Sequence, residues 1–198
     1  VTCIATNEIT IEVQQFAIDN AEELQEIMKG ARFYWVADMT KGYWQILLAE
    51  KSQWLFCFAT PWGPKKWLRA PMGSKVTAPY FDYCVAKALM SAGLLRNGVE
   101  MIHDDHAGHA SVIYDADPAS KSHYQLLRRY LKMACEYRIR LSPKKFELFL
   151  TQADIGGYMN EHGGMRPSPP RYQAIVEQQK PVTPRSSIWH YDGHRLVA

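Results

Sequence analysis

Cysteine is scarce in this sequence, and so are long apolar runs. The four cysteines stand far apart, at Cys3, Cys57, Cys84 and Cys135, so the spacing predicts neither a zinc site nor a disulfide framework, and a reducing compartment fits best. No apolar run approaches the roughly 18 residues of a membrane span, and no basic-then-apolar leader opens the chain. We therefore expect an intracellular protein, of cytoplasm or nucleus, with no membrane partner.

Basic side chains are nearly missing from residues 1–30, which hold six acids and one Lys. Residues 31–198 hold 22 bases and 14 acids, so the net charge of +3 combines an acidic start of −5 with a basic body of +8. A basic body suits a polyanionic partner such as nucleic acid, although a solvated surface often has the same balance. The length of 198 residues, 47% hydrophobic and 22% charged, is typical of one soluble domain or one and a half.

Predicted helices and strands are mixed along the chain. Helical spacing and capping residues predict helices at 20–28, 77–92 and 117–137, the last with Tyr124, Leu127, Leu131 and Ala134 on its apolar face. Apolar and β-branched runs predict strands at residues 1–5, 9–13, 33–38, 44–49, 54–60, 65–69, 108–114, 146–150 and 155–159. This order indicates an α+β fold with antiparallel hairpins.

Two adjacent carboxylates, Asp104 and Asp105, end a short apolar run. Neighbouring side chains of a strand point to opposite faces, so both can serve one site only at a tight turn. Their charges repel, and burying either one costs several kcal/mol unless a cation compensates, which suits magnesium. A solvated turn between two strands is the alternative. A third carboxylate, Asp38, ends the predicted strand 33–38 and favours the metal site.

Six segments, in order, resemble the reverse transcriptase of gypsy-type LTR retrotransposon Pol polyproteins. Residues 33–46 (FYWVADMTKGYWQI) are similar to the family's Phe-Ser-X-Leu-Asp-Leu-X-Ser-Gly-Tyr-X-Gln-Ile, and residues 102–105 (IHDD) stand where it has Tyr-X-Asp-Asp. The other matches are residues 58–63 (FATPWG), 69–81 (RAPMGSKVTAPYF), 141–145 (LSPKK) and 164–167 (GMRP). The resemblance covers about residues 31–180 and implies a reverse-transcriptase-like palm, an antiparallel sheet packed on helices. Residues 1–30 would be a reduced fingers segment, 31–180 the palm with adjoining fingers, and 181–198 a divergent tail.

The resemblance implies an RNA-directed DNA polymerase, which joins a deoxynucleotide to a primer 3′-hydroxyl with two Mg²⁺ or Mn²⁺ ions. Asp38, Asp104 and Asp105 would be the catalytic residues and the metal ligands. Its partners would be an RNA or DNA template-primer duplex, deoxynucleotides, and the remainder of a Pol polyprotein or another protein. Two further groups of residues would bind substrates: Tyr43, Gln45, Met72 and Gly73 at the nucleotide, and Ile102 and Gly157 at the primer.

Some departures from the family favour a different function. Ile102 replaces the family's Tyr, and residues 106–110 (HAGHA) are poor strand formers. The family's Arg that binds the triphosphate has no counterpart here, because no Arg or Lys precedes Lys29. A catalytically inactive or repurposed palm-fold module that binds nucleic acid or protein is therefore the main alternative. A third interpretation is a zinc or manganese site built from His103, His106 and His109 with the two carboxylates.

Overall fold

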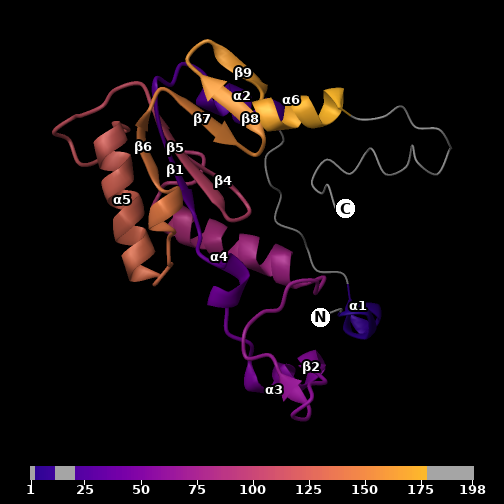
Figure 1. The fold of residues 1–198 in the computed structure, drawn as a ribbon. Coiled ribbons are helices and arrows are strands. Elements are labelled where there is room, and N and C mark those ends of the chain that lie inside the picture. Colours follow the sequence, from indigo (N-terminus) through magenta and orange to yellow (C-terminus); the bar gives the residue numbers. More distant parts are fainter. Residues whose placement is uncertain (1–2, 12–20, 178–198) are drawn as a thin grey trace.

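The computed structural model describes residues 3–11 and 21–177, and a four-stranded sheet lies at its centre (Figure 1). The strand order is β4-β5-β1-β6, and every neighbouring pair is antiparallel. β1 is central because Tyr34, Trp35 and Ala37 are buried on both of its faces. The strands are β1 (Phe33–Asp38), β4 (Val99–Ile102), β5 (Asp105–Ala110) and β6 (Glu147–Leu150).

Two helices, α4 (Thr77–Ser91) and α5 (His123–Glu136), pack on one face of this sheet. Alternate residues of β1 point to opposite faces, and Trp35 and Ala37 point to the helices. The main core forms here from β1, α4, α5 and the hairpin of β4 and β5. Its largest fully buried side chains include Trp35, Phe81, Leu89, Leu94, Leu126, Tyr130 and Met133.

The other face of the sheet meets a second, three-stranded sheet at one end of the molecule (Figure 1). Tyr34 and Ala107 pack there against Ala153 and Ile155. The strands are β7 (Gln152–Ile155), β8 (Tyr158–Glu161) and β9 (Gly164–Pro167), and α2 (Ala21–Met28) and α6 (Pro169–Val176) lie beside them.

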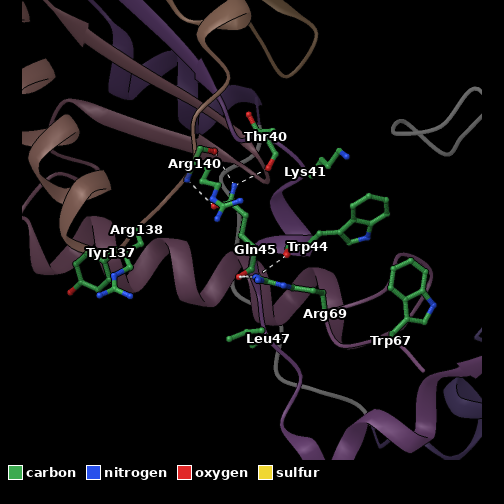
Figure 2. Close-up of a pocket in the computed structure, with 10 residues that line it drawn as sticks. All are labelled: Thr40, Lys41, Trp44, Gln45, Leu47, Trp67, Arg69, Tyr137, Arg138 and Arg140. Carbon is green, nitrogen blue, oxygen red and sulfur yellow. Dashed lines mark hydrogen bonds between the residues drawn. The ribbon is translucent and has the colours of Figure 1, made fainter. Parts of the chain in front are cut away.

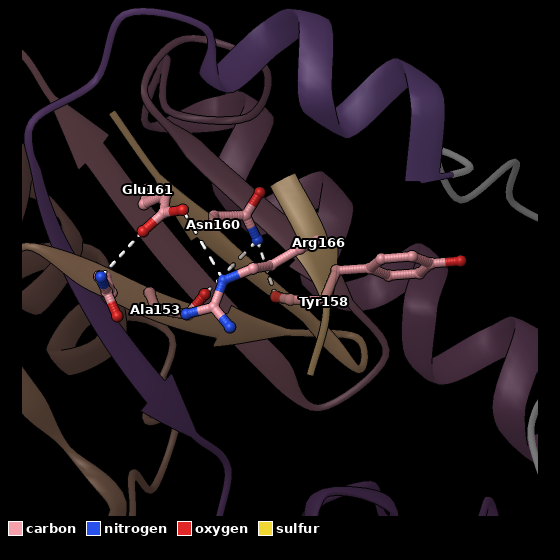
Figure 3. Close-up of polar contacts among 6 residues, drawn as sticks. Ala153, Tyr158, Asn160, Glu161 and Arg166 are labelled. Atoms are coloured by element: carbon pink, nitrogen blue, oxygen red, sulfur yellow. Dashed lines mark hydrogen bonds and ion pairs between the residues drawn. The ribbon is translucent and has the colours of Figure 1, made fainter. Parts of the chain in front are cut away.

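Side-chain contacts tie the three strands of the second sheet together, as Figure 3 shows. Asn160 donates from Nδ2 to the carbonyl oxygen of Tyr158 at 2.9 Å. Gln152 donates to the Glu161 carboxylate at 2.8 Å, and Arg166 Nε lies 3.7 Å from the other oxygen of the same group. The Gln152 and Arg166 contacts thus join β7 and β9 to Glu161 of β8.

Short elements form the opposite end of the molecule (Figure 1). The two-stranded sheet of β2 and β3 is antiparallel, with Cys57 opposite Lys66. These elements are α1 (Ile4–Ile9), the 3-10 turns η1 (Gly42–Gln45) and η2 (Trp54–Phe56), α3 (Glu50–Gln53), β2 (Cys57–Phe58) and β3 (Lys65–Lys66).

Several predicted strands are wrong in this part of the chain. Residues 4–9 form α1, and the predicted strand 44–49 is largely replaced by η1 and an extended segment. The predicted strand 54–60 shortens to Cys57–Phe58, and 65–69 to Lys65–Lys66. Aromatic residues caused the error, because Trp44 and Trp67 pack on each other between loops, with ring centroids 5.8 Å apart. Residues 1–2, 12–20 and 178–198 lie outside the described residues, and so does residue 20, the first residue of the helix predicted at 20–28.

The helices and strands predicted further along the chain agree better with the structure. The helix predicted at 77–92 is α4, and the predicted strand 146–150 is β6, but 155–159 contains the turn between β7 and β8. The helix predicted to begin at Asp117 begins at His123, because the Ser122 hydroxyl caps it by accepting from Gln125 N. Half of its predicted apolar face is wrong, since Tyr124 and Leu131 are exposed, whereas Ala134 is buried and Leu127 packs against the core. The buried face also includes His123, Leu126, Tyr130 and Met133.

Candidate active site

Asp38 and Asp105 lie directly opposite each other on neighbouring strands. They are the last register pair of β1 and β5. Residues paired in this way point to the same face, which is the face of Tyr34 and Ala107 and not the face covered by α4 and α5. Two carboxylates from distant parts of the sequence therefore meet at one end of the sheet, away from the helices.

Asp104 lies in the tight turn that joins β4 to β5. Ile102 pairs with Asp105, so only His103 and Asp104 form the turn, and His103 adopts a left-handed φ of 55°. The carbonyl oxygen of Asp104 accepts a hydrogen bond from Met39 N at 3.1 Å, which fixes the turn against the end of β1. The predicted tight turn is present, and Asp105, not Asp104, is the strand partner of Asp38.

Repulsion within this carboxylate cluster is visible in the pKa of Asp105. Desolvation raises the pKa of the Asp105 carboxyl above its usual range, and the charges of Asp104 and Asp38 raise it further. Lys145 opposes this effect: its Nζ donates to Asp38 Oδ2 at 2.7 Å, and that bond raises the pKa of Lys145. A protein cation thus already neutralises part of the charge on Asp38.

In the described part of the chain, these side chains are not arranged as a metal site. Among residues 3–11 and 21–177, no group of three or more His, Cys, Asp or Glu side chains is placed to hold a metal ion. The residue types fit Mg²⁺ or Mn²⁺, because Asp38, Asp104 and Asp105 offer oxygen ligands in one place. A metal ion at Asp38 would have to compete with the Lys145 ammonium, which already contacts one carboxylate oxygen.

The neighbouring histidines do not join the carboxylates in a metal site. His106 points to the helix face, where Nδ1 is hydrogen-bonded to the Tyr130 hydroxyl at 2.6 Å, and burial lowers the pKa of His106 to about 4. His109 contacts Glu100 at 3.2 Å. His103 bonds to buried Asp82 at 3.0 Å, and that bond raises the pKa of His103. The alternative built from His103, His106 and His109 is therefore not supported by their placement.

Tyr43 and Gln45, predicted at the nucleotide, belong to η1 just beyond Asp38. The Tyr43 ring packs edge-on against Phe81 of α4, with centroids 5.1 Å apart. A Cβ on Gly42 would lie 2.8 Å from Phe81 and 3.5 Å from the Asp104 Cβ, so glycine lets η1 approach the carboxylate turn. The Gln45 amide instead bonds to backbone: Nε2 donates to the carbonyls of residues 40 and 140, and Oε1 accepts from residue 140 N.

Met72 and Gly73, also predicted at the nucleotide, lie in an exposed loop before α4. The Met72 side chain is exposed. Asn7 of α1 forms two hydrogen bonds with this loop. Its Nδ2 donates to the Gly73 carbonyl at 2.8 Å, and its Oδ1 accepts from Lys75 N at 2.9 Å. The helix that replaces a predicted strand therefore positions this loop.

Ile102 and Gly157, predicted at the primer, lie on two facing hairpins. Gly156 and Gly157 form the two-residue turn between β7 and β8, with φ of 60° and 80°. A Cβ on Gly156 would lie 2.5 Å from Ile102 Cδ1, so Gly156 makes the close approach and Gly157 completes the turn. The Gly157 carbonyl accepts from Ser168 N at 3.0 Å.

Two features of this site were not assigned from the sequence. Lys145 stands inside the matched segment 141–145, so its basic residues were visible although the ion pair with Asp38 was not. The second is a cleft beside η1 that gathers cations from three separate segments (Figure 2). No local pattern could reveal it, because Lys41 and Arg140 are nearly 100 residues apart.

Known proteins include relatives of this chain in sequence. The chain is 28% identical over 159 residues to the "Enzymatic polyprotein" of Figwort mosaic virus (strain DxS), covering 80% of this chain. It is 25% identical over 176 residues to the "Retrovirus-related Pol polyprotein from transposon 297" of Drosophila melanogaster, covering 89% of this chain. It spans only 22% and 16% of these relatives. No model of a known protein family matches it.

Solved structures show the same fold. The foamy viral protease-reverse transcriptase dRH in complex with double-stranded DNA superposes with a TM-score of 0.74 at 19% identity, over 93% of this chain and 30% of that one. Its relative in complex with an RNA/DNA hybrid gives 0.68 at 20% identity, over 95% of this chain and 24% of that one. The fold is that of a reverse-transcriptase domain, α+β with an antiparallel palm sheet.

The chain is thus similar in sequence to the polyproteins of Figwort mosaic virus and transposon 297, and it has the fold of a reverse-transcriptase domain. Its assignment to the gypsy type stays a prediction, and so do the boundaries at residues 30 and 180. No helix in the described part of the chain has the length and apolar character needed to cross a membrane.

Proposed function

We propose that this chain is the palm and adjoining fingers of an RNA-directed DNA polymerase. The observation that carries the proposal is the pairing of Asp38 with Asp105 at one end of the open sheet face, with Asp104 in the adjoining turn. Its relationship to Pol polyproteins supports the same reaction class. Its partners would be a template-primer duplex and deoxynucleotides, as in the nucleic-acid complexes formed by its structural neighbours.

The chain's own residues would hold and order the reactants. Asp38, Asp104 and Asp105 would bind two Mg²⁺ or Mn²⁺ ions, which when bound lower the pKa of the primer 3′-hydroxyl and neutralise the leaving pyrophosphate. Tyr43, held against Phe81, would limit the space beside the sugar of the incoming nucleotide. Gly157 would allow the primer backbone to approach closely.

Primer extension tests this proposal directly. The full chain is assayed on poly-rA/oligo-dT with Mg²⁺ or Mn²⁺, beside Asp104→Asn and a matched control, Asp154→Asn, which removes an exposed carboxylate that also raises the pKa of Asp105. We expect Asp104→Asn to lower extension by about 100-fold or more, as other electrostatic deletions do. The Asp154→Asn variant should keep most of the activity.

Two outcomes would contradict the proposal. Extension that survives Asp104→Asn would place the reaction elsewhere. The absence of extension by the unaltered chain with either metal would favour the alternative, an inactive palm-fold module that binds nucleic acid or protein. The 2.7 Å ion pair between Lys145 and Asp38 supports that alternative, because a resident cation lowers the need for a metal ion.

A further inference from the structure

Helix α5 carries a second apolar stripe on a side that the core does not cover. Tyr124, Leu127 and Leu131 recur at the i, i+3, i+7 spacing of one helix face. Tyr124 is 46% exposed and Leu131 is 38% exposed, whereas Leu127 packs partly against the main core. Neither the core nor the proposed reaction uses the two exposed members of this stripe.

The apolar surface continues from α5 onto the loop before it and onto β6 beside it (Figure 1). Two backbone hydrogen bonds, of 2.8 and 3.0 Å, join residues 112 and 113 to the first residues of α5. The Tyr114 ring lies 5.6 Å from the Tyr124 ring, and the Phe149 ring stacks on His123. The exposed apolar side chains of this surface, called the outer face below, are Val112, Ile113, Tyr114, Tyr124, Leu131 and Phe149. Contiguous apolar surface marks interaction sites on soluble proteins.

Phe149 is held on the outer face by strained backbone. Its φ of 56° lies in the left-handed region, where a bulky residue is an outlier. Strain that keeps an aromatic ring exposed is of the kind found at ligand sites. β6 is also an edge strand, and its register against β1 shifts between residues 34 and 36. Because an irregular edge pairs poorly with a further strand, the outer face offers side chains and not a sheet edge.

The charge beside the apolar stripe is positive. The three basic residues of α5 are Arg128, Arg129 and Lys132, and its one acid is Glu136. Arg128 and Lys132 are exposed. Within residues 3–11 and 21–177, Arg128 has no carboxylate partner, and Lys132 has only Glu136, at 3.9 Å. The two acids of the preceding loop accept hydrogen bonds within their own turns. The outer face therefore suits a partner that is both apolar and acidic.

Two other occupants fit the outer face less well. An antiparallel contact between two α5 helices would bring Arg128 and Lys132 of both copies together, where like charges repel. Nucleic acid would use the cations, but aliphatic side chains such as Leu131 offer nothing to phosphates or bases.

We propose that the outer face binds an acidic amphipathic helix of a partner protein. Its apolar side chains would pack on Tyr124 and Leu131, and its carboxylates would contact Arg128 and Lys132. Tyr124 and Leu131 lie two turns apart, about 10 Å along α5, which matches the spacing of anchors on a docked helix. The carboxylates of the candidate active site lie on the opposite face of the central sheet. The proposal is therefore an addition to the proposed reaction, and it does not depend on primer extension.

Fluorescence anisotropy of the full chain with a labelled model peptide tests the proposal. The probe is a peptide of about 18 residues, long enough to be helical in water, with Leu at i, i+3, i+7 spacing and Glu on both flanks. We expect it to bind at least about 10-fold more tightly than a peptide of the same composition with scrambled Leu positions, because only a continuous stripe buries apolar area on both helices. A version with Lys in place of Glu should bind at least about 10-fold more weakly, because its charges repel those of α5.

Two double variants locate the binding surface. Tyr124→Gln/Leu131→Gln should weaken binding of the acidic peptide by about 10-fold or more, because both apolar anchors are lost. The matched control, Tyr83→Gln/Met90→Gln, removes two exposed apolar side chains of α4 and should change affinity less than about twofold.

A charge reversal tests the electrostatic part. In Arg128→Glu/Lys132→Glu the preference should invert, so that the Lys peptide binds more tightly than the Glu peptide. All of these positions are exposed, so each variant should unfold in urea at nearly the same midpoint as the unaltered chain.

Four results would overturn the proposal. The first is no binding of the acidic peptide by the unaltered chain, and the second is equal affinity in the unaltered chain and Tyr124→Gln/Leu131→Gln. The third is self-association of the unaltered chain in sedimentation velocity that this variant abolishes, which would make a second copy the occupant. The fourth is displacement of the peptide by an oligonucleotide whose binding needs Arg128 and Lys132 but not Tyr124 and Leu131, which would make the surface one for nucleic acid.

Discussion

Gly108 explains how a strand of small and polar residues becomes part of the central sheet. A Cβ at this position would lie 2.0 Å from Trp35 Cε2. Trp35 is fully buried and packs on Tyr130, with centroids 4.5 Å apart, and on Phe146. His106 of the same strand reaches Tyr130 as well. The poor strand-forming composition of residues 106–110 thus reflects the large rings that lie over them.

Gly108→Ala should therefore destabilise the fold. The added methyl group overlaps a ring that has no room to move, which costs about 1–3 kcal/mol or more. The midpoint of urea unfolding measures the change. Gly163→Ala is the control, because nothing lies within 4 Å of its Cβ position, and its effect should stay within about 0.5 kcal/mol. Equal stability of the two variants would show that Trp35 does not pack as described.

At the level of whole elements, the start of α5 depends on residues that the sequence pattern did not single out. Ser122 caps the helix, and His123 follows it, fully buried and stacked on Phe149 of β6 with ring centroids 4.7 Å apart. In the described part of the chain, neither ring nitrogen of His123 has a hydrogen-bond partner. Burial lowers the pKa of His123, so the imidazole is held neutral between α5 and β6.

This contact predicts an acid-sensitive junction between α5 and β6. Because the folded state disfavours the protonated imidazole, its contribution is complete above the unfolded pKa of about 6.5 and is lost as the pH falls from there towards the lower folded pKa. His123→Phe keeps a ring on Phe149 but cannot titrate. Its free energy of unfolding should fall less between pH 6.5 and 5 than that of the unaltered chain, measured by urea unfolding at each pH. Parallel pH curves for the two proteins would rule this out.

Local pattern predicted the elements whose burial follows their own periodicity. Strand 33–38 and helix α4 are confirmed nearly to the residue because apolar side chains recur there at the spacing of each structure. The predicted start of α5 was too early because Asp117 resembles a helix N-cap. In the structure the Asp117 carboxylate accepts a hydrogen bond from Ala119 N within a turn. The carboxylates were found by their motif, but the register that pairs Asp38 with Asp105 arises only when the strands meet.

Across the whole molecule, the two faces of the central sheet have different surroundings. Helices α4 and α5 cover one face, and the carboxylates end on the other, beside the hairpin of β7 and β8 (Figure 1). A duplex whose primer end reaches Asp38 and Asp105 would approach from this second face. The charge balance suits that partner, since residues 31–198 carry +8. Structural neighbours hold double-stranded DNA and an RNA/DNA hybrid.

Duplex binding should therefore be weak and steeply dependent on salt. Each phosphate that a Lys or Arg neutralises releases counterions, so about four such contacts would lower the affinity about 100-fold between 50 and 200 mM salt. Fluorescence anisotropy with an RNA/DNA hybrid measures this dependence, and an uncharged-backbone duplex of the same sequence is the control. Acidic residues 1–30 reduce the net attraction, so affinity at physiological salt should be low. Binding that is absent at 50 mM salt, or indifferent to salt, would mean that the basic body serves only as a solvated surface.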